Sequence, residues 1–231
     1  MPSTIAPVSS SPWPMTPLLP SQASFADDFQ RPDTTLGLGD GWDMRGDYDE
    51  SSYGQSNPIM PAATDGFIKD GHYTYSGAST VFAAQQLRGT VRALGTVGRF
   101  RRIGAGDETA FAMAISANGQ LIFDMVIFSA TSLSWQLRLR RDRGDYQPVM
   151  SGIFEPKLET NVNYQFEFNV IGDTITVRVP GAEVTRDAPV SGLVGDRVFW
   201  QEAIQSPPSG VVFDFDTVWA AEDGQPLFPV A

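Results

Sequence analysis

Residues 164–179 have the sequence Tyr164-Gln165-Phe166-Glu167-Phe168-Asn169-Val170-Ile171-Gly172-Asp173-Thr174-Ile175-Thr176-Val177-Arg178-Val179. On both sides of the Gly-Asp pair, apolar side chains alternate with polar ones. A period of two places the apolar set on one face of a strand and the polar set on the other face, in water. Gly172 tolerates the positive φ that a tight hairpin turn requires. The stretch therefore predicts an antiparallel hairpin with one buried and one solvated face.

Similar short segments recur along the chain, with turn residues between them. The expected strands are Ser24–Phe29, Phe67–Lys69, His72–Tyr75, Ser79–Phe82, Leu87–Val97, Phe111–Ser116, Gln120–Phe128, Leu133–Arg140, Val149–Phe154, Tyr164–Ile171, Thr174–Val179, Arg197–Trp200 and Val211–Trp219. No segment keeps a 3.6-residue apolar period, so helix should be minor. Many short strands with frequent turns predict an all-β fold, a jelly-roll β-sandwich.

Composition limits the possible functions. The chain has 231 residues, of which 42% are hydrophobic, and it has no cysteine, which excludes disulfides and thiolate metal sites. Its net charge of −11 argues against nucleic-acid binding. No apolar run approaches the ~20 residues of a membrane span, so no membrane insertion is expected. Residues 88–143 nevertheless carry nine arginines against four acids, which either pair with acids of flanking strands or form an interface for an anionic ligand.

The chain divides into an N-terminal arm, residues 1–24, and a globular domain, residues 25–231. The arm is rich in proline and serine and has no charged side chain, which favours an extended conformation. A disordered tail is one interpretation. The alternative is an arm that lies on a partner surface, because apolar side chains are costly to leave in water. The candidate docking residues are Trp13, Met15, Leu18 and Leu19.

Catalytic motifs are scarce. His72 is the single histidine, and there is no nucleophile elbow, phosphate-binding loop or metal motif, so no catalytic residue, metal or cofactor is predicted. Glycoside hydrolysis needs two carboxylates, and alternate residues of a strand lie ~6.5–7 Å apart on one face. Asp214 and Asp216 have this spacing. Solvation at a sheet edge or an arginine partner is the competing interpretation of this pair, and it is the one we favour.

Carbohydrate binding needs less: exposed aromatic rings with polar groups nearby. The irregular segment 30–66 and the strand ends around it supply aromatic side chains, and the arginine-rich strands supply polar ones. The candidate glycan-binding residues are Trp42, Tyr48, Tyr53, His72, Tyr75, Arg138 and Arg140, with Tyr73 beside them.

Both ends of the globular part resemble a known family. The opening, Phe25-x-Asp27-Asp28-Phe29-x-Arg31-x-Asp33 with Leu36-Gly37 and Trp42, resembles that of concanavalin A-like (laminin G-like) jelly-roll domains found in tail and baseplate proteins of actinobacterial phages. The Tyr164–Gly181 hairpin and the closing Phe213-Asp214-Phe215-Asp216 strand are similar to theirs. The Glu-x-Asp-x-x-Glu strand of laminarinase-like members is absent from this sequence.

The resemblance implies a structural role rather than catalysis. We expect a non-enzymatic virion protein of a tailed phage, a minor tail, baseplate or capsid-surface component. Its arm, residues 1–24, would bind other virion proteins, a homo-oligomer is expected, and the sandwich would contact host cell-surface glycans. The alternatives are a stand-alone carbohydrate-binding module or lectin, and a glycan hydrolase that uses Asp214 and Asp216 or loop carboxylates.

Overall fold

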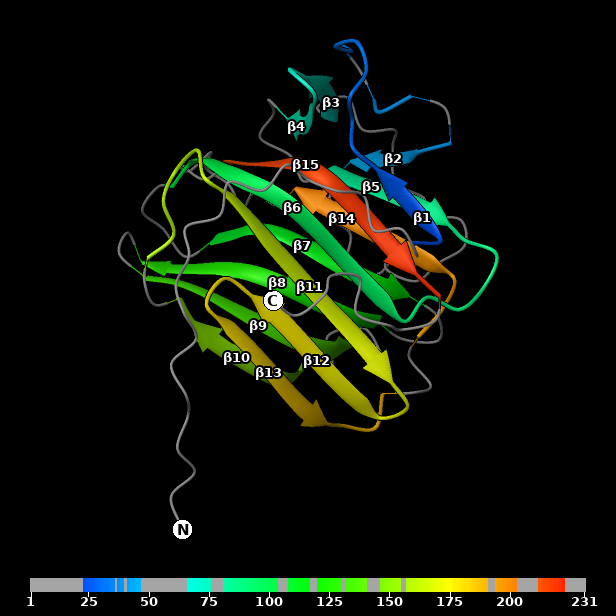
Figure 1. Ribbon diagram of the computed structural model, residues 1–231, viewed down its shortest axis with the longest axis vertical. Coiled ribbons are helices and arrows are strands. Elements are labelled where there is room, and N and C mark those ends of the chain that lie inside the picture. Colours follow the sequence, from blue (N-terminus) through cyan, green and yellow to red (C-terminus); the bar gives the residue numbers. More distant parts are fainter. Residues whose placement is uncertain are drawn as a thin grey trace.

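The computed structural model consists of strands packed in two layers (Figure 1). It describes residues 23–35, 37–39, 41–46, 66–75, 81–103, 108–116, 120–129, 132–140, 146–154, 157–190, 194–202 and 212–222. Every pairing between two of its strands is antiparallel, and two isolated bridges, Gly37 with Phe67 and Phe100 with Thr160, are parallel. The predicted all-β class is thus confirmed, and no helix long and apolar enough to cross a membrane occurs in the described ranges.

The eight-stranded sheet has the order β13-β12-β11-β6-β15-β4-β3, with β1 also paired to β15. Its strands are β1 (Phe25–Asp27), β3 (Gly66–Lys69), β4 (His72–Tyr75), β6 (Ala93–Arg102), β11 (Asn163–Ile171), β12 (Thr174–Val179), β13 (Ala182–Asp187) and β15 (Val212–Ala221). The opening and closing strands are therefore neighbours, with Phe25 opposite Ala220.

The seven-stranded sheet has the order β10-β9-β8-β7-β14-β5-β2. Its strands are β2 (Asp43–Gly46), β5 (Val81–Gln86), β7 (Glu108–Ser116), β8 (Gln120–Ser129), β9 (Ser132–Arg140), β10 (Tyr146–Ile153) and β14 (Arg197–Glu202). It lies behind the first sheet in the view of Figure 1. Apolar side chains from the facing sides of the two sheets form one core.

Aromatic rings fill the centre of this core. The ring of Phe111, from β7, lies 4.1 Å from that of Phe213 and 5.6 Å from that of Phe215, measured between centroids. Tyr73 of β4 stacks on Phe215 at 5.2 Å. Because Phe213 and Phe215 point inward, Asp214 between them and Asp216 directly after Phe215 point to the outer face of the sheet.

The predicted hairpin is confirmed, but one of its faces differs from the prediction. β11 and β12 pair with Val170 opposite Ile175, and Gly172 has a φ of 63°. The polar face of β11 was expected in water, yet Glu167 is 0% exposed and Asn169 is 4% exposed. The carboxylate of Glu167 is instead paired with Arg178, at 2.7 Å.

The remaining differences concern weakly patterned segments. β6 begins at Ala93 rather than Leu87, because the N–H groups of Leu87 and Val91 bond to loop carbonyls of residues 195–196. β13 was not predicted because almost all of its residues are exposed, so it shows no apolar alternation. β2 lies in the segment that was expected to be irregular.

Candidate active site

The closing strand β15 carries two acids on its outer face. Asp214 and Asp216 flank the inward-pointing Phe215, as the sequence predicted. The register against β6 shifts between Phe215 and Thr217, so Asp216 is the extra residue of a β-bulge. Bulges redirect side chains and occur often beside functional sites. Among the described strands, β15 alone has two carboxylates at alternate positions.

Asp214 is held by cations and a hydroxyl. The Thr74 hydroxyl donates a hydrogen bond of 2.6 Å to Oδ1. Arg101 lies 3.5 Å and Arg99 3.7 Å from the carboxylate, of which only 5% is exposed. The arginine partners considered for this acid are confirmed, and they compensate the charge of a carboxylate that is nearly buried.

Asp216 has a different environment. Its side chain is 9% exposed, and its Oδ1 lies 3.3 Å from His72 Nε2. Burial raises the pKa of this carboxyl above the usual 3.8; the charges of His72 and Arg99 oppose the rise, and the charge of Asp28 adds to it. Oδ2 has no hydrogen-bond partner. Asp216 therefore keeps a proton more readily than a solvent-exposed aspartate does.

His72 has a defined proton arrangement. Its Nδ1 lies 2.7 Å from the carbonyl oxygen of Asp70. Because a carbonyl oxygen can only accept, Nδ1 carries a hydrogen, and the neutral ring has its lone pair on Nε2. The contact between Nε2 and Asp216 thus requires one proton, carried by the imidazole or by the carboxyl group.

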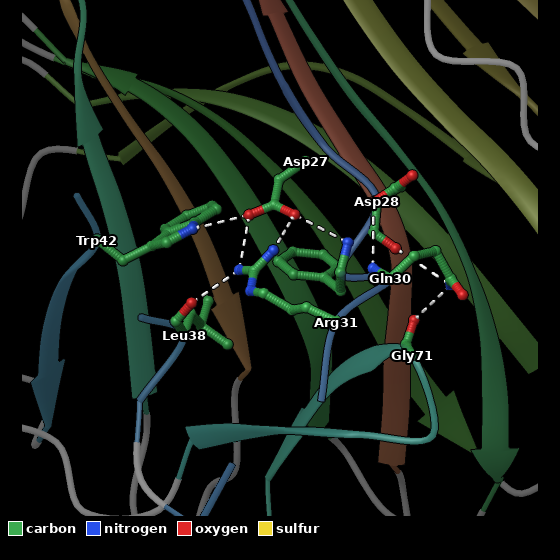
Figure 2. Close-up of polar contacts among 8 residues, drawn as sticks. Asp27, Asp28, Gln30, Arg31, Leu38, Trp42 and Gly71 are labelled. Atoms are coloured by element: carbon green, nitrogen blue, oxygen red, sulfur yellow. Dashed lines mark hydrogen bonds and ion pairs between the residues drawn. The ribbon is translucent and has the colours of Figure 1, made fainter. Parts of the chain in front are cut away.

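The chain opening forms a tight polar turn next to this strand (Figure 2). The carboxylate of Asp27 accepts hydrogen bonds from both terminal nitrogens of Arg31, at 2.6 and 2.8 Å, from Trp42 Nε1 at 2.9 Å and from the Phe29 N–H at 2.8 Å. Burial works against ionisation of Asp27, but these hydrogen bonds outweigh it and lower its pKa. Phe29, fully buried, has a φ of 54°, which is strained for an aromatic residue.

Trp42 was predicted as a glycan-stacking side chain, and the structure places it elsewhere. Its ring packs against Phe25 at 5.4 Å, Trp200 at 5.7 Å and Phe29 at 5.9 Å, and its indole N–H is bonded to Asp27. This ring joins the opening of the chain to the core, so its faces are used by other aromatic rings.

The other predicted glycan-binding residues do not assemble with Trp42. His72 lies on β4 in the acid cluster, whereas Arg138 lies on β9 of the opposite sheet and is half-buried. Tyr75 and Arg140 are placed only by their backbones, in β4 and β9. Tyr48, Tyr53 and the docking candidates Trp13, Met15, Leu18 and Leu19 lie outside the described residues.

Several site residues were not predicted. Thr74, Arg99 and Arg101 surround Asp214, and Asp28 acts on Asp216. Arg99 and Asp214 become neighbours through the pairing of β6 with β15. The alternation of β6 could have indicated that Arg99 and Arg101 share a face, but not which strand lies beside them. In the described part of the chain, no three acidic or histidine side chains are grouped closely enough to hold a metal ion.

Comparisons with known proteins identify the fold. Neither a model of a known protein family nor a curated protein matches the sequence. The solved structures that are similar include LamAcat from Zobellia galactanivorans, with a TM-score of 0.57, 10% identity and coverage of 87% of this chain and 98% of that one. SCLam, a non-specific endo-β-1,3(4)-glucanase of family GH16, has a TM-score of 0.56, 15% identity and coverage of 88% and 92%. The β-glucanase of Bacillus licheniformis has a TM-score of 0.55, 10% identity and coverage of 87% and 99%.

These similarities confirm the jelly-roll β-sandwich and correct the functional prediction. SCLam, the Bacillus licheniformis β-glucanase and a laminarinase from Thermotoga petrophila share the fold over 92, 99 and 96% of their chains, and all three are glucanases rather than phage proteins. The prediction of a non-enzymatic virion protein is therefore wrong. That expectation rested on the resemblance at both ends of the globular part and on the apolar, uncharged arm of residues 1–24, with the absent Glu-x-Asp-x-x-Glu strand as the argument against catalysis.

Proposed function

We propose that the protein is a glycoside hydrolase that cleaves a β-linked polysaccharide with the two carboxylates of β15. The observation that carries the proposal is the pair itself: Asp214 and Asp216 lie on one strand and one face, in unlike environments. A carboxyl group with a raised pKa beside a second carboxylate is the usual basis of acid–base catalysis at glycosidic bonds. The glucanase-like fold supports the same class of substrate.

The roles follow from the contacts. Asp216, whose pKa is raised by burial, acts as the general acid and gives its proton to the glycosidic oxygen as the bond from the anomeric carbon to that oxygen breaks. Asp214, charge-compensated by Arg99 and Arg101, acts as the base and takes a proton from the water whose oxygen bonds to the anomeric carbon. His72 positions Asp216 through the shared proton.

No described strand of the seven-stranded sheet carries two carboxylates: Asp43, Glu108, Asp124 and Glu202 each lie on a separate strand. Asp43 on β2 and Asp124 on β8 are four strands apart, which is ~19 Å at the usual strand spacing. That is far beyond the ~5–9.5 Å over which two carboxyl groups act on one glycosidic bond. Asp43 is also paired with Arg197, at 3.0 Å.

The test is the release of reducing ends by the full-length protein. The substrates are β-1,3-glucan, mixed-linkage β-1,3-1,4-glucan and β-galactan, and the variants are Asp214→Asn and Asp216→Asn. Asp33→Asn is the matched control, because Asp33 is an exposed acid paired with Lys69 at 3.2 Å. We expect each β15 variant to lose about a hundredfold or more in rate, as for loss of a general acid or base, and the control to keep full rate.

Two results separate the activity from the site. If both the Asp214→Asn and the Asp216→Asn proteins hydrolyse a polymer at the full rate, the protein is a hydrolase whose active site lies elsewhere. No hydrolysis of any of these polymers by the unaltered chain, with the protein folded, would refute the proposed function. Affinity electrophoresis in the same polymers would show whether glycan binding remains.

A further inference from the structure

The arginine-rich segment of the sequence places two of its side chains beside the acid pair. Arg99 and Arg101 lie on the outer face of β6, because Phe100 between them is fully buried in the core. β6 and β15 run side by side in Figure 1, and their register puts Arg99 opposite Asp214. The two guanidinium groups therefore lie at the Asp214 end of the site.

Both arginine side chains are partly open to solvent. The exposed fraction is 33% for Arg99 and 47% for Arg101, whereas it is 5% for Asp214. Arg99 Nε lies 3.7 Å and a terminal nitrogen of Arg101 lies 3.5 Å from the Asp214 carboxylate, longer than the about 2.7–3.2 Å of a hydrogen bond. Asp214 thus uses the charge of the two arginines, while their N–H groups stay available to another acceptor.

The described part of the chain offers these N–H groups few acceptors. A guanidinium group carries several donors and cannot accept. One terminal nitrogen of Arg101 donates to the Thr74 hydroxyl, at 2.9 Å, and the buried Nε of Arg99 has no hydrogen-bond partner in the described residues. The planar donor set of an arginine matches the two oxygens of a carboxylate. These two side chains are therefore suited to hold a carboxylate brought by a ligand.

The charges at the Asp214 end of the site do not balance. The contact of His72 with Asp216 carries one proton, so it is neutral overall whichever group has that proton. The charge of Asp28 acts on Asp216, on the side of the pair that faces His72. Charge compensation of Asp214 needs one of the two arginines, and the other leaves a local positive charge on a chain of net charge −11. Such a local charge favours an anionic group at this point.

We propose that the substrate is an acidic polysaccharide and that Arg99 and Arg101 hold a carboxylate of the sugar bound beside Asp214. The inference rests on the proposed function, because it places the sugar chain over the β15 acids. Sugars of the uronate class carry such a carboxylate at C6. Neutral polymers bind the same site but leave the guanidinium groups without this acceptor, so they are cleaved more slowly.

A matched pair of polymers tests the inference. The first is the neutral β-linked polymer that the full-length protein cleaves best, and the second is the same polymer with its C6 alcohols oxidised to carboxylates. We expect kcat/KM to be about tenfold or more higher on the oxidised polymer, the effect of one hydrogen bond between charged groups. A chain of net charge −11 repels an acidic polymer as a whole, so this preference would have to come from a local site.

Substitutions identify the residues responsible. Arg99→Gln and Arg101→Gln should each reduce the ratio of the two kcat/KM values toward one. The ratio is used because both arginines also stabilise Asp214, so that a loss of catalysis lowers both rates alike. Arg88→Gln is the matched control: Arg88 is an exposed arginine that precedes β6, at the end of the strand opposite Arg99 and Arg101, and its loss should leave the ratio unchanged.

The outcomes separate this inference from the proposed function. Hydrolysis of both polymers at equal kcat/KM would overturn the carboxylate subsite while the hydrolase stands, and so would a preference that both Gln substitutions leave intact. If neither polymer is cleaved, the proposed function fails and affinity electrophoresis tests the subsite alone. Tighter binding of the oxidised polymer that is lost in Arg99→Gln or Arg101→Gln would support the subsite, and equal binding of the two polymers would overturn it.

Discussion

The imidazole Nε2 of His72 lies 3.3 Å from Oδ1 of Asp216, while Nδ1 of the same ring faces the Asp70 carbonyl oxygen at 2.7 Å. The pair therefore binds one proton at a nearly buried position on the outer face of β15. Residues 144 positions apart (72 and 216) meet through the contact of β4 with β15, in which Tyr73 is opposite Phe215. Burial at this position raises the pKa of the Asp216 carboxyl group.

Asp216 should make stability fall as pH rises. Burial raises its pKa above 3.8, so the folded protein holds a proton that the unfolded chain releases between pH 3.8 and the raised value. Ionisation of Asp216 costs stability across that window. Asp216→Asn should therefore be more stable than the unaltered protein above the window and gain nothing below pH 3.8, as measured by urea midpoints from pH 3 to 7.

Asp33 is the control, because its pKa is lowered and its effect on the pH dependence of stability has the opposite sign to that of Asp216. The Asp70 N–H and Lys69 lower its pKa, so its contribution is present above pH 3.8 and is lost as pH falls below it. Asp33→Asn should not gain stability at neutral pH. If Asp216→Asn were the less stable protein at pH 7, the charges of His72 and Arg99 would outweigh burial.

The Asp27 network should stabilise the fold more than an ordinary surface ion pair. Asp27→Asn keeps the shape but weakens the paired bonds from Arg31 and leaves one amide oxygen for Trp42 and the Phe29 N–H. Hydrogen bonds to a charged group contribute about 1.5–3 kcal/mol, and we expect a loss of about 2–3 kcal/mol at pH 7 by denaturant unfolding. Because the pKa of Asp27 is lowered, the loss should shrink as pH falls below 3.8. A loss that did not change with pH would mean that the ionised form is not what the network stabilises.

Two substitutions of Trp42 distinguish a structural role of its ring from a role in glycan binding. Trp42→Phe keeps an aromatic ring against Phe25 and Trp200 but removes the donor to the Asp27 carboxylate, and should cost about 1.5–3 kcal/mol. Trp42→Ala removes the ring and should cost about 3–5 kcal/mol, as for large core aromatics. Unfolding measurements beside affinity electrophoresis would decide the matter: a loss of glycan binding by Trp42→Ala with unchanged stability would restore the stacking role predicted from the sequence.

The fold could be predicted from the sequence because buried and exposed residues alternate along a strand, which gives the sequence a period of two. Leu133–Arg140 and the hairpin of residues 164–179 show this directly, and both were located within a residue or two. The site was not accessible in the same way. That Asp214 and Asp216 share a face follows from spacing alone, whereas Arg99, Thr74 and His72 reach them through strand pairings that no local pattern encodes.

The burial of polar residues also could not be predicted from the sequence. Glu167 occupies the outward position of its strand, where the pattern predicts water, and is fully buried. Its partner Arg178 lies opposite it on β12, so the ion pair follows from the hairpin register once that is known.

Gly95 should not tolerate a side chain. A Cβ would lie 2.3 Å from Trp219 Cζ2 and 2.9 Å from the Phe166 carbonyl oxygen, so the indole and the backbone would both have to move. Gly95→Ala should cost about 1–3 kcal/mol, typical of overpacking. Gly172→Asn is the matched control, because that turn position is open and asparagine accepts a positive φ. Equal stability of Gly95→Ala and the unaltered protein would contradict the placement of Trp219 over β6.

The contacts of Asp214 predict the stereochemistry of the proposed reaction, because an inverting glycosidase needs a base that acts on water and a retaining one needs a nucleophile that bonds to the sugar. Asp214 is occupied by Thr74 and two arginines, so it is better placed to act on a water molecule than to form a covalent bond to sugar. Hydrolysis of a β-linked polysaccharide should therefore release the α-anomer first, which proton NMR at early times resolves before mutarotation. Initial release of the β-anomer would exclude direct attack by water and, with it, the roles assigned to Asp214 and Asp216.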